Sequence, residues 1–138
     1  MTSRADKLSR IVSLVKLQLR LSEWQLAQLR QQEQTMQDEQ AWLVGTLNGG
    51  KAPAGSSSDS IARRLNRTSV GARAVQERAA MQLDKVRSEN RRVKQLEEVA
   101  KVALAAKLRD AENRSLEEMT GTHAARDLMS RSASRTKP

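Results

Sequence analysis

The chain contains no cysteine, phenylalanine or tyrosine, and it has only two tryptophan residues among its 138 residues. The absence of cysteine excludes disulfide bonds and thiolate metal sites, and it fits a reducing compartment. The scarcity of aromatic side chains excludes the thick core of an ordinary globular domain. Alanine, leucine, glutamine, arginine and glutamate are used instead, and these residues favour long helices.

Uninterrupted hydrophobic runs are also missing from the sequence. A helix needs about 18 to 20 consecutive apolar residues to span a bilayer. In this chain Lys16 and Arg20 interrupt one of the more apolar segments, residues 11–21. We therefore expect no transmembrane helix.

Few side chains are available for catalysis or for metal binding. His123 is the only histidine, and without cysteine the chain has neither a nucleophile–base pair nor a histidine and cysteine cluster. Adjacent carboxylates such as Glu97 and Glu98 diverge by about 100° around a helix, so they are better explained as solubilising charge. We expect no enzymatic activity, no metal and no cofactor.

Apolar residues with an alternating 4-3 spacing run through the first third of the chain and predict a coiled-coil helix over residues 5–48. Nine of the twelve positions are apolar. We call these positions, and their counterparts in the second helix, the seam. In the first helix the seam consists of Leu8, Val12, Val15, Leu19, Ser22, Leu26, Leu29, Glu33, Met36, Gln40, Leu43 and Leu47.

A second helix is predicted over residues 59–120, after a loop at 49–58 that is rich in glycine, alanine and serine. Ser58 or Asp59 is expected to cap it, and Gly71 is expected to bend or fray it locally. Ten of its thirteen seam positions are apolar. They are Ile61, Leu65, Thr68, Ala72, Val75, Ala79, Gln82, Val86, Glu89, Val93, Leu96, Ala100 and Ala103.

These elements predict an all-α fold, an antiparallel coiled-coil hairpin formed by one domain over residues 1–120. Gly121 is expected to end the second helix, and residues 121–138 are expected to form a disordered basic tail. If Leu47 faces Ile61, residues whose numbers add up to 108 face one another, and Leu8 meets Ala100. The second helix then overhangs the first over residues 101–119.

Two apolar surfaces have no partner in such a hairpin. The first is formed by Leu14, Leu17, Leu21 and Trp24, on the side of the first helix opposite its seam. The second is the face of the overhang, formed by Leu104, Leu108, Leu116 and Met119. Exposed apolar surfaces of this size usually mark contact sites. The contact is either with another protein or with further copies of the chain in a self-assembled structural coiled coil.

Positive charge is concentrated in the second helix. Residues 61–94 contain ten basic and three acidic side chains, whereas residues 95–119 contain four basic and six acidic ones. A basic stripe that includes Arg87, Arg91, Arg92 and Lys94 is a candidate for binding nucleic acid, as in a nucleoid-associated protein. Docking on an acidic protein or lipid surface and a simple solvated helix face are the alternatives.

The pattern resembles the FliJ family, the small coiled-coil proteins of the bacterial flagellar type III export apparatus, and their YscO-like injectisome counterparts. Two long antiparallel helices, an overhanging second helix and a basic end carry the resemblance. In residues it includes Ala111-Glu112-Asn113-Arg114, Met119 and Ala124-Ala125-Arg126. The resemblance implies a cytoplasmic protein, peripheral to the inner membrane, that acts as a stalk in the export ATPase hexamer. It also implies contacts with the export gate and with chaperones.

The resemblance also implies roles for particular residues. The end that bears both termini enters the ATPase ring in this family, and here that end carries Leu14, Leu17, Leu21, Trp24 and the overhang. The face that contacts the export gate lies near the start of the second helix in this family. Its counterpart here is the set Ile61, Leu65, Thr68 and Ala72, whose alternative role is packing within the seam.

Overall fold

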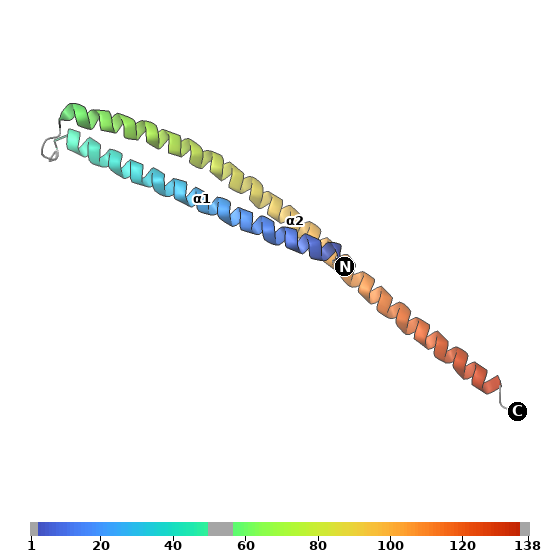
Figure 1. Cartoon of the computed structure of the whole chain (residues 1–138). Coiled ribbons are helices and arrows are strands. Elements are labelled where there is room, and N and C mark those ends of the chain that lie inside the picture. Colours follow the sequence, from blue (N-terminus) through green and yellow to red (C-terminus); the bar gives the residue numbers. More distant parts are fainter. Residues whose placement is uncertain (1–2, 50–56, 136–138) are drawn as a thin grey trace. The chain divides into compact units, whose positions relative to one another are not determined.

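The computed structural model describes residues 3–49 and 57–135 and contains two helices. Helix α1 is Arg4–Leu47 and helix α2 is Ser58–Arg135 (Figure 1). The described residues contain no strand, so the predicted all-α class is confirmed. Helix α1 begins and ends within one residue of the predicted bounds, 5–48. The predicted loop at 49–58 falls mostly on residues 50–56, which lie outside the described part of the chain.

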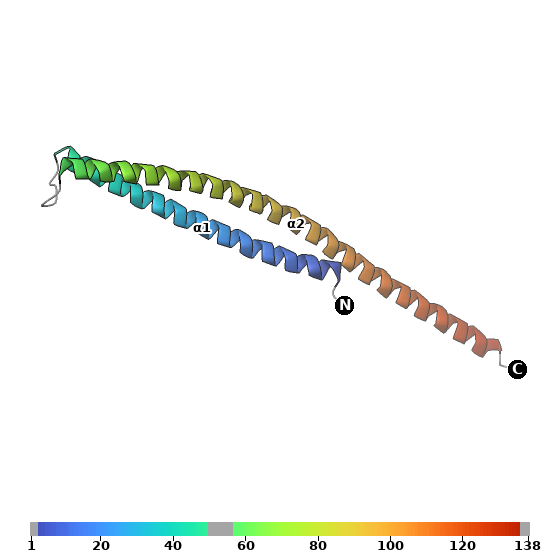
Figure 2. The ribbon, with the colours of Figure 1, turned by 45° about the horizontal axis from the view of Figure 1, so that its top comes forward.

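Contacts between residues divide the chain into two units. Unit 1 consists of Met1–Val12 and Gln95–Pro138, and unit 2 is Ser13–Lys94. Within unit 2, α1 and α2 run antiparallel and lie side by side, as Figure 2 also shows. Within unit 1, the first residues of α1 lie beside α2 as far as Lys107. The predicted single domain over residues 1–120 stays a prediction.

The predicted seam is the line along which α1 and α2 pack. The most buried apolar side chains of unit 2 all come from seam positions, and Leu43 is only 1% exposed. These side chains are Val15, Leu26, Leu43, Ile61, Val75, Ala79 and Val93. Every other described seam position is buried or half-buried, except Leu47 at 37%. The 4-3 pattern therefore identifies the core.

Contacts across unit 2 confirm the predicted register. Gln40 Nε2 donates to Ser69 Oγ at 2.9 Å, and Gln82 Nε2 donates to Gln25 Oε1 at 3.3 Å. The numbers of these two pairs add up to 109 and 107, beside the predicted 108. Those of Gln82 with Ser22 and of Arg64 with Glu39 add up to 104 and 103, about one helical turn away. The antiparallel pairing was therefore predictable from the seam together with the position of the loop.

Two polar residues of the seam differ in their hydrogen bonding. Ser22 is only 2% exposed, and its backbone carbonyl accepts a hydrogen bond of 2.9 Å from Gln82 Nε2. In contrast, Glu89 Oε2 is buried and has no hydrogen-bond partner among the described residues. A buried polar atom without a partner costs stability, so Glu89 is a weak point of the seam.

The expected disturbance at Gly71 is absent, because α2 continues through this residue as regular helix. A Cβ atom at position 71 would lie 3.5 Å from Cε of Met36, so the Met36 side chain fills the space beside the glycine. The nearby hydrogen bond between Gln40 and Ser69 fixes the same turn. Tertiary packing offsets the low helix propensity of glycine here.

The N-terminal cap of α2 is also one residue earlier than expected. Ser57 Oγ accepts a hydrogen bond of 3.2 Å from the backbone N–H of Ser60, and the Ser57 carbonyl accepts one from Ile61. Ser57 therefore caps the helix, and the prediction of Ser58 or Asp59 is wrong. A run of serines offers several equivalent hydroxyls, which is why the sequence did not decide between them.

The predicted end of α2 at residue 120 is wrong, because the helix continues to Arg135. Gly121 does not adopt a positive φ. The hydroxyls of Thr120 and Thr122 donate to backbone carbonyls four residues earlier, each at 2.8 Å. A single glycine costs a helix only about 1 kcal/mol. The predicted disordered tail is therefore helical up to Arg135, and residues 136–138 lie outside the described part.

We expect Gly71→Ala to raise the free energy of unfolding by about 1 kcal/mol, because alanine has the higher helix propensity and lower entropy in the unfolded chain. The new Cβ would meet Met36 at an ordinary contact distance, 3.5 Å. Chemical denaturation followed by circular dichroism measures the change. Gly71→Leu is the contrasting variant, since its longer side chain must displace Met36 and should lower stability. A loss with alanine would contradict the prediction.

Replacing Glu89 by leucine should raise the free energy of unfolding by about 1 to 2 kcal/mol, because it removes an unpaired buried oxygen and adds apolar contact. Glu77→Leu is the matched control, since Glu77 is exposed on α2 and a surface change should stay within about 0.5 kcal/mol. The same denaturation experiment compares the two variants. Destabilisation by Glu89→Leu would show that the carboxylate has a stabilising role in the seam.

Candidate functional site

An exposed row of large apolar side chains runs along α1 in unit 2. Leu14, Leu17, Leu21 and Trp24 are between 56% and 65% exposed. We call these four residues the outer α1 stripe. The seam residues that alternate with them, such as Val15 and Ser22, are buried against α2. The stripe therefore lies on the side of α1 that faces away from α2, as predicted.

A second exposed apolar face lies on α2 in unit 1. Leu104, Leu108, Leu116 and Met119 are between 51% and 64% exposed. From position 106 to 134 every residue of α2 is exposed. We call residues 108–135 the C-terminal extension. It begins later than the predicted overhang at 101, because the start of α1 pairs with α2 as far as Lys107.

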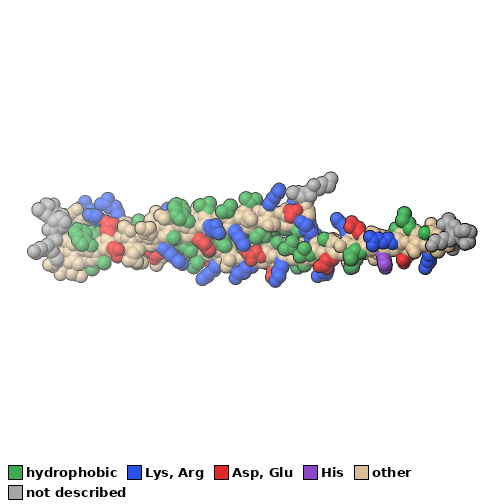
Figure 3. All heavy atoms as spheres, turned by 90° about the horizontal axis from the view of Figure 1, so that it is seen from below, with side chains coloured by type: hydrophobic (Ala, Val, Ile, Leu, Met, Phe, Trp, Pro, Cys, Tyr) green, Lys and Arg blue, Asp and Glu red, His purple; other side chains and the backbone are tan. Residues whose placement is uncertain are grey.

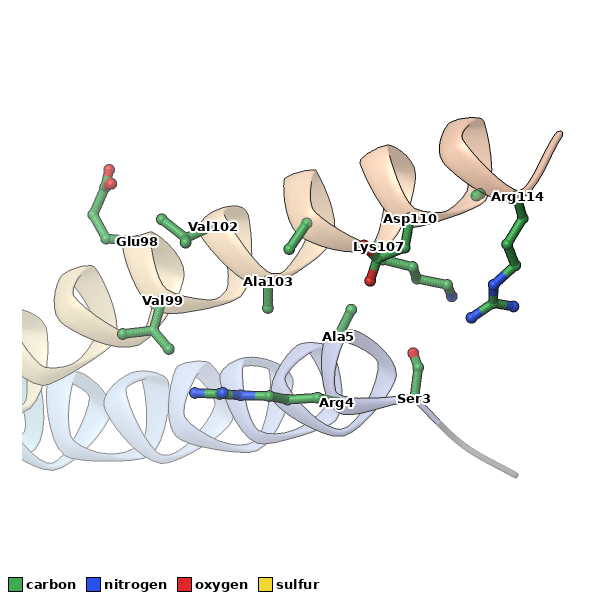
Figure 4. A pocket seen from close by; sticks show the side chains of 12 residues that line it. Ser3, Arg4, Ala5, Glu98, Val99, Val102, Ala103, Lys107, Asp110 and Arg114 are labelled. Atoms are coloured by element: carbon green, nitrogen blue, oxygen red, sulfur yellow. The ribbon is translucent and has the colours of Figure 1, made fainter. Parts of the chain in front are cut away.

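A groove in unit 1 lies between the first turn of α1 and the facing part of α2. Its volume is about 730 Å³, and Ala5, Ala103 and Ala106 line its inner wall. Arg4 and Arg114 lie at its edge, with Lys107 between them (Figure 4). Sequence reasoning missed this groove. The signal was present, because one further step of the 4-3 spacing back from Leu8 reaches the small residue Ala5.

The first turn of α1 is closed by two reciprocal hydrogen bonds. The backbone N–H of Asp6 donates to Ser3 Oγ at 3.2 Å, and the backbone N–H of Ser3 donates to Asp6 Oδ2 at 3.3 Å. Lys107 Nζ also lies 3.3 Å from Asp6 Oδ1. The Ser3 side chain, and then the Lys107 ammonium, hold the pKa of the Asp6 carboxyl below its ordinary value. This capping arrangement was not predicted.

The basic residues of α2 are distributed over more than one side of the helix. At about 100° per residue, Arg87, Arg91 and Lys94 share one side, while Arg92 lies about 100° from Arg91. Arg92 belongs instead to a row with Arg64, Arg78 and Lys85, whose members are separated by multiples of seven residues. We call this second set the basic row of α2. The four residues proposed as one basic stripe are thus parts of two rows.

Only one member of the basic row has an acidic partner among the described residues. Arg64 Nη2 lies 2.7 Å from Glu39 Oε1, and Arg64 Nε donates to the same oxygen at 2.9 Å. Arg78, Lys85 and Arg92 make no ion pair in the part of the chain that the structure describes. The row therefore presents unneutralised positive charge along unit 2.

The residues assigned to the export gate by resemblance lie in the seam. Ile61 is buried, and Leu65, Thr68 and Ala72 are half-buried. The structure shows them packing in the hairpin, which was their alternative role. Their binding to an export gate stays a prediction.

The described residues include no group of three or more histidine and carboxylate side chains placed to hold a metal ion. His123 is exposed on the C-terminal extension. None of the described helices is long and apolar enough to cross a membrane. The features with the clearest potential for function are therefore the two exposed apolar faces and the basic row.

Comparison with known proteins leaves the family undecided. No protein-family model matches the chain, and no curated protein and no solved structure matches it. The surfaces described above, with the resemblance in helix arrangement, are the basis for a functional proposal.

The lowered pKa of Asp6 predicts a pH dependence of the first turn of α1. An aspartate in the unfolded chain has a pKa of about 3.9, and the folded value is lower. The carboxylate therefore stabilises the fold fully above about pH 4, and this stabilisation is lost as the pH falls through the folded pKa.

Amide protection factors in residues 6–9, measured by NMR between about pH 6 and pH 3, should fall at the acidic end. Asp6→Asn is the control, because its side chain does not titrate and its protection should stay nearly constant. Equal losses in the two proteins would contradict the role of Asp6.

Proposed function

We propose that the chain is a non-enzymatic coiled-coil component of the bacterial flagellar or injectisome type III protein export apparatus. In this role it acts as a stalk in the export ATPase hexamer and also contacts the export gate and chaperones. The observation that carries the proposal is the presence of two exposed apolar faces, the outer α1 stripe in unit 2 and the α2 face of Leu104, Leu108, Leu116 and Met119 in unit 1.

The two-helix seam supports the mechanical part of the proposal. A stalk has to resist bending when the ring around it changes conformation. Paired helices that interlock through Leu26, Leu43, Ile61 and Val75 are stiffer than a single helix. ATP is hydrolysed by the partner in this mechanism, and the chain contributes shape and contact surface.

The exposed apolar residues supply the binding energy in the proposal. Burying one leucine or tryptophan side chain contributes about 1.5 to 3 kcal/mol. Trp24 and Leu21 are adjacent in the outer α1 stripe, and both are more than half exposed. Tryptophan is among the residues that most often dominate protein interfaces. These two side chains are therefore expected to contribute strongly to ATPase binding.

A basic coiled coil that binds nucleic acid is the second candidate, and the unneutralised basic row favours it. Such binding should weaken steeply with salt, because each phosphate contact releases counterions. The helix α2 has no aromatic residue to stack on bases. A cytoplasmic location at the inner membrane, reached through partner proteins, belongs to the first proposal only.

The test is the activity of a purified type III export ATPase, titrated with the wild-type chain and two double variants. Leu21→Ala/Trp24→Ala truncates two of the four side chains of the outer α1 stripe. Leu108→Ala/Leu116→Ala truncates two apolar side chains of the C-terminal extension. Each should weaken stimulation of the ATPase by about ten-fold or more, since loss of a buried anchor costs about 2 kcal/mol.

Val70→Ala/Met81→Ala is the matched control, because both residues are exposed apolar residues on α2 outside these faces. It should leave stimulation unchanged. An ATPase that neither binds nor responds to the wild-type chain would contradict the stalk proposal. Salt-sensitive DNA binding that Lys85→Glu/Arg92→Glu abolishes would then favour the second candidate.

A further inference from the structure

The outer α1 stripe has the spacing of a second coiled-coil seam. Leu14, Leu17, Leu21 and Trp24 follow one another by three, four and three residues, and Gln28 continues the pattern. A 3-4 alternation keeps side chains in one line along a supercoiled helix. The stripe therefore fits a further helix that packs along α1, so that the coiled coil would have three helices.

Space for such a helix continues past the apolar part of the stripe. A shallow groove of about 400 Å³ lies on the flank of α1 between its outer side and its seam. Gln28, Gln31 and Thr35 line it on the outer side, and Met36 and Glu39, the partner of Arg64, line it towards the seam. Gln28, Gln31 and Thr35 extend the same 3-4 spacing. The apolar stripe is thus followed along α1 by a polar, grooved surface. This suits a partner helix whose contact face is apolar along most of its length and polar at one end.

Charge around the stripe restricts what this helix is. The ion pair between Glu39 and Arg64 shows the register along one edge of the hairpin. The same register, applied in steps of seven residues, places Gln25 opposite Arg78 and Gln18 opposite Lys85. At about 100° per residue, Gln18 and Gln25 lie between the stripe and the seam, on the flank of the stripe nearer to α2. Glutamine does not neutralise a cation, so this flank stays positively charged.

Acidic side chains are nearly absent from the same stretch of α1. Glu23 is the one acidic residue between positions 13 and 31. At about 100° per residue it lies on the far side of α1 from the centre of the stripe. Figure 3 shows hydrophobic and basic side chains close together on one face of the molecule, with acidic side chains among them. The stripe and its edge are complementary to a ligand that is apolar and acidic.

We propose that the outer α1 stripe binds an acidic amphipathic helix of a partner protein, which packs along α1 as the third helix of a coiled coil. Its apolar residues contact Leu14, Leu17, Leu21 and Trp24, and its carboxylates pair with Lys85 and the other free members of the basic row. The inference deepens the proposed function and rests on its claim that the stripe binds a protein.

Two other occupants fit the observations less well. A second copy of the chain would bring one unneutralised basic row close to another, and like charges brought together at an interface are unfavourable. A nucleic acid would use the basic row but would leave Leu17 and Trp24 exposed. An acidic helix satisfies both the apolar and the charged side chains.

The experiment measures binding of synthetic helical peptides to the full chain by Trp fluorescence and isothermal titration calorimetry. The probe has leucine at the 3-4 positions and glutamate on both flanks. Its matched control has the same leucines with lysine on both flanks. The acidic peptide should bind at least about ten-fold more tightly than the basic one, because charge complementarity suppresses the wrong partner.

Two variants of the chain separate the apolar part of the site from the charged part. Leu21→Ala/Trp24→Ala and Lys85→Glu/Arg92→Glu should each weaken binding of the acidic peptide by about ten-fold or more. The second variant should also strengthen binding of the basic peptide. Because all four residues are exposed, circular dichroism should show unchanged helix content.

Several outcomes would overturn the proposal. One is equal binding of the two peptides, and another is binding of the acidic peptide that neither variant weakens. A third comes from light scattering: a wild-type oligomer that dissociates in the Leu21→Ala/Trp24→Ala variant would show that a second copy of the chain occupies the stripe. The ATPase titration is a separate readout. Peptide binding without ATPase stimulation would reject the export function and leave the acidic-helix site standing.

Discussion

The pairing of α1 with α2 through the 4-3 seam is the constraint on which the other features depend. It uses one side of each helix, and its most buried side chains, such as Leu43 and Val75, are small in number. No third element covers the remaining sides in the described part of the chain. Many large apolar side chains, such as Leu14 and Met81, are therefore left exposed, and the surfaces available to a partner are exposed helix faces.

The same seam fixes the register on the outside of the hairpin. Gln82 donates to the Ser22 carbonyl and Gln40 to Ser69, so polar residues in the seam add specificity to apolar contacts that would tolerate a shift. A shift of α2 by one turn would separate Arg64 from Glu39 and change which basic side chains border the stripe. The charge pattern next to Leu14 and Trp24 is thus a consequence of hydrogen bonds inside the seam.

The fold was largely predictable from sequence because a coiled coil repeats one simple rule over many residues. The seam, the register and the exposed stripe all follow from spacing. The errors occurred where a single residue decides. Gly121 was expected to stop α2, but one glycine is a small cost among good helix formers. The cap at Ser57 and the bonds of Ser3 with Asp6 depend on side-chain geometry that spacing does not specify.

The seam also determines how much free energy is needed for a partner to reach each surface. The face that contains Ile61 and Leu65 is packed against α1, so a partner that binds there has to separate the helices near their connection. Burying an isoleucine or leucine side chain is worth about 1.5 to 3 kcal/mol, and this contribution is lost on opening. The outer α1 stripe requires no opening, because Leu17 and Trp24 already face solvent. If both surfaces are functional, the stripe is therefore occupied first.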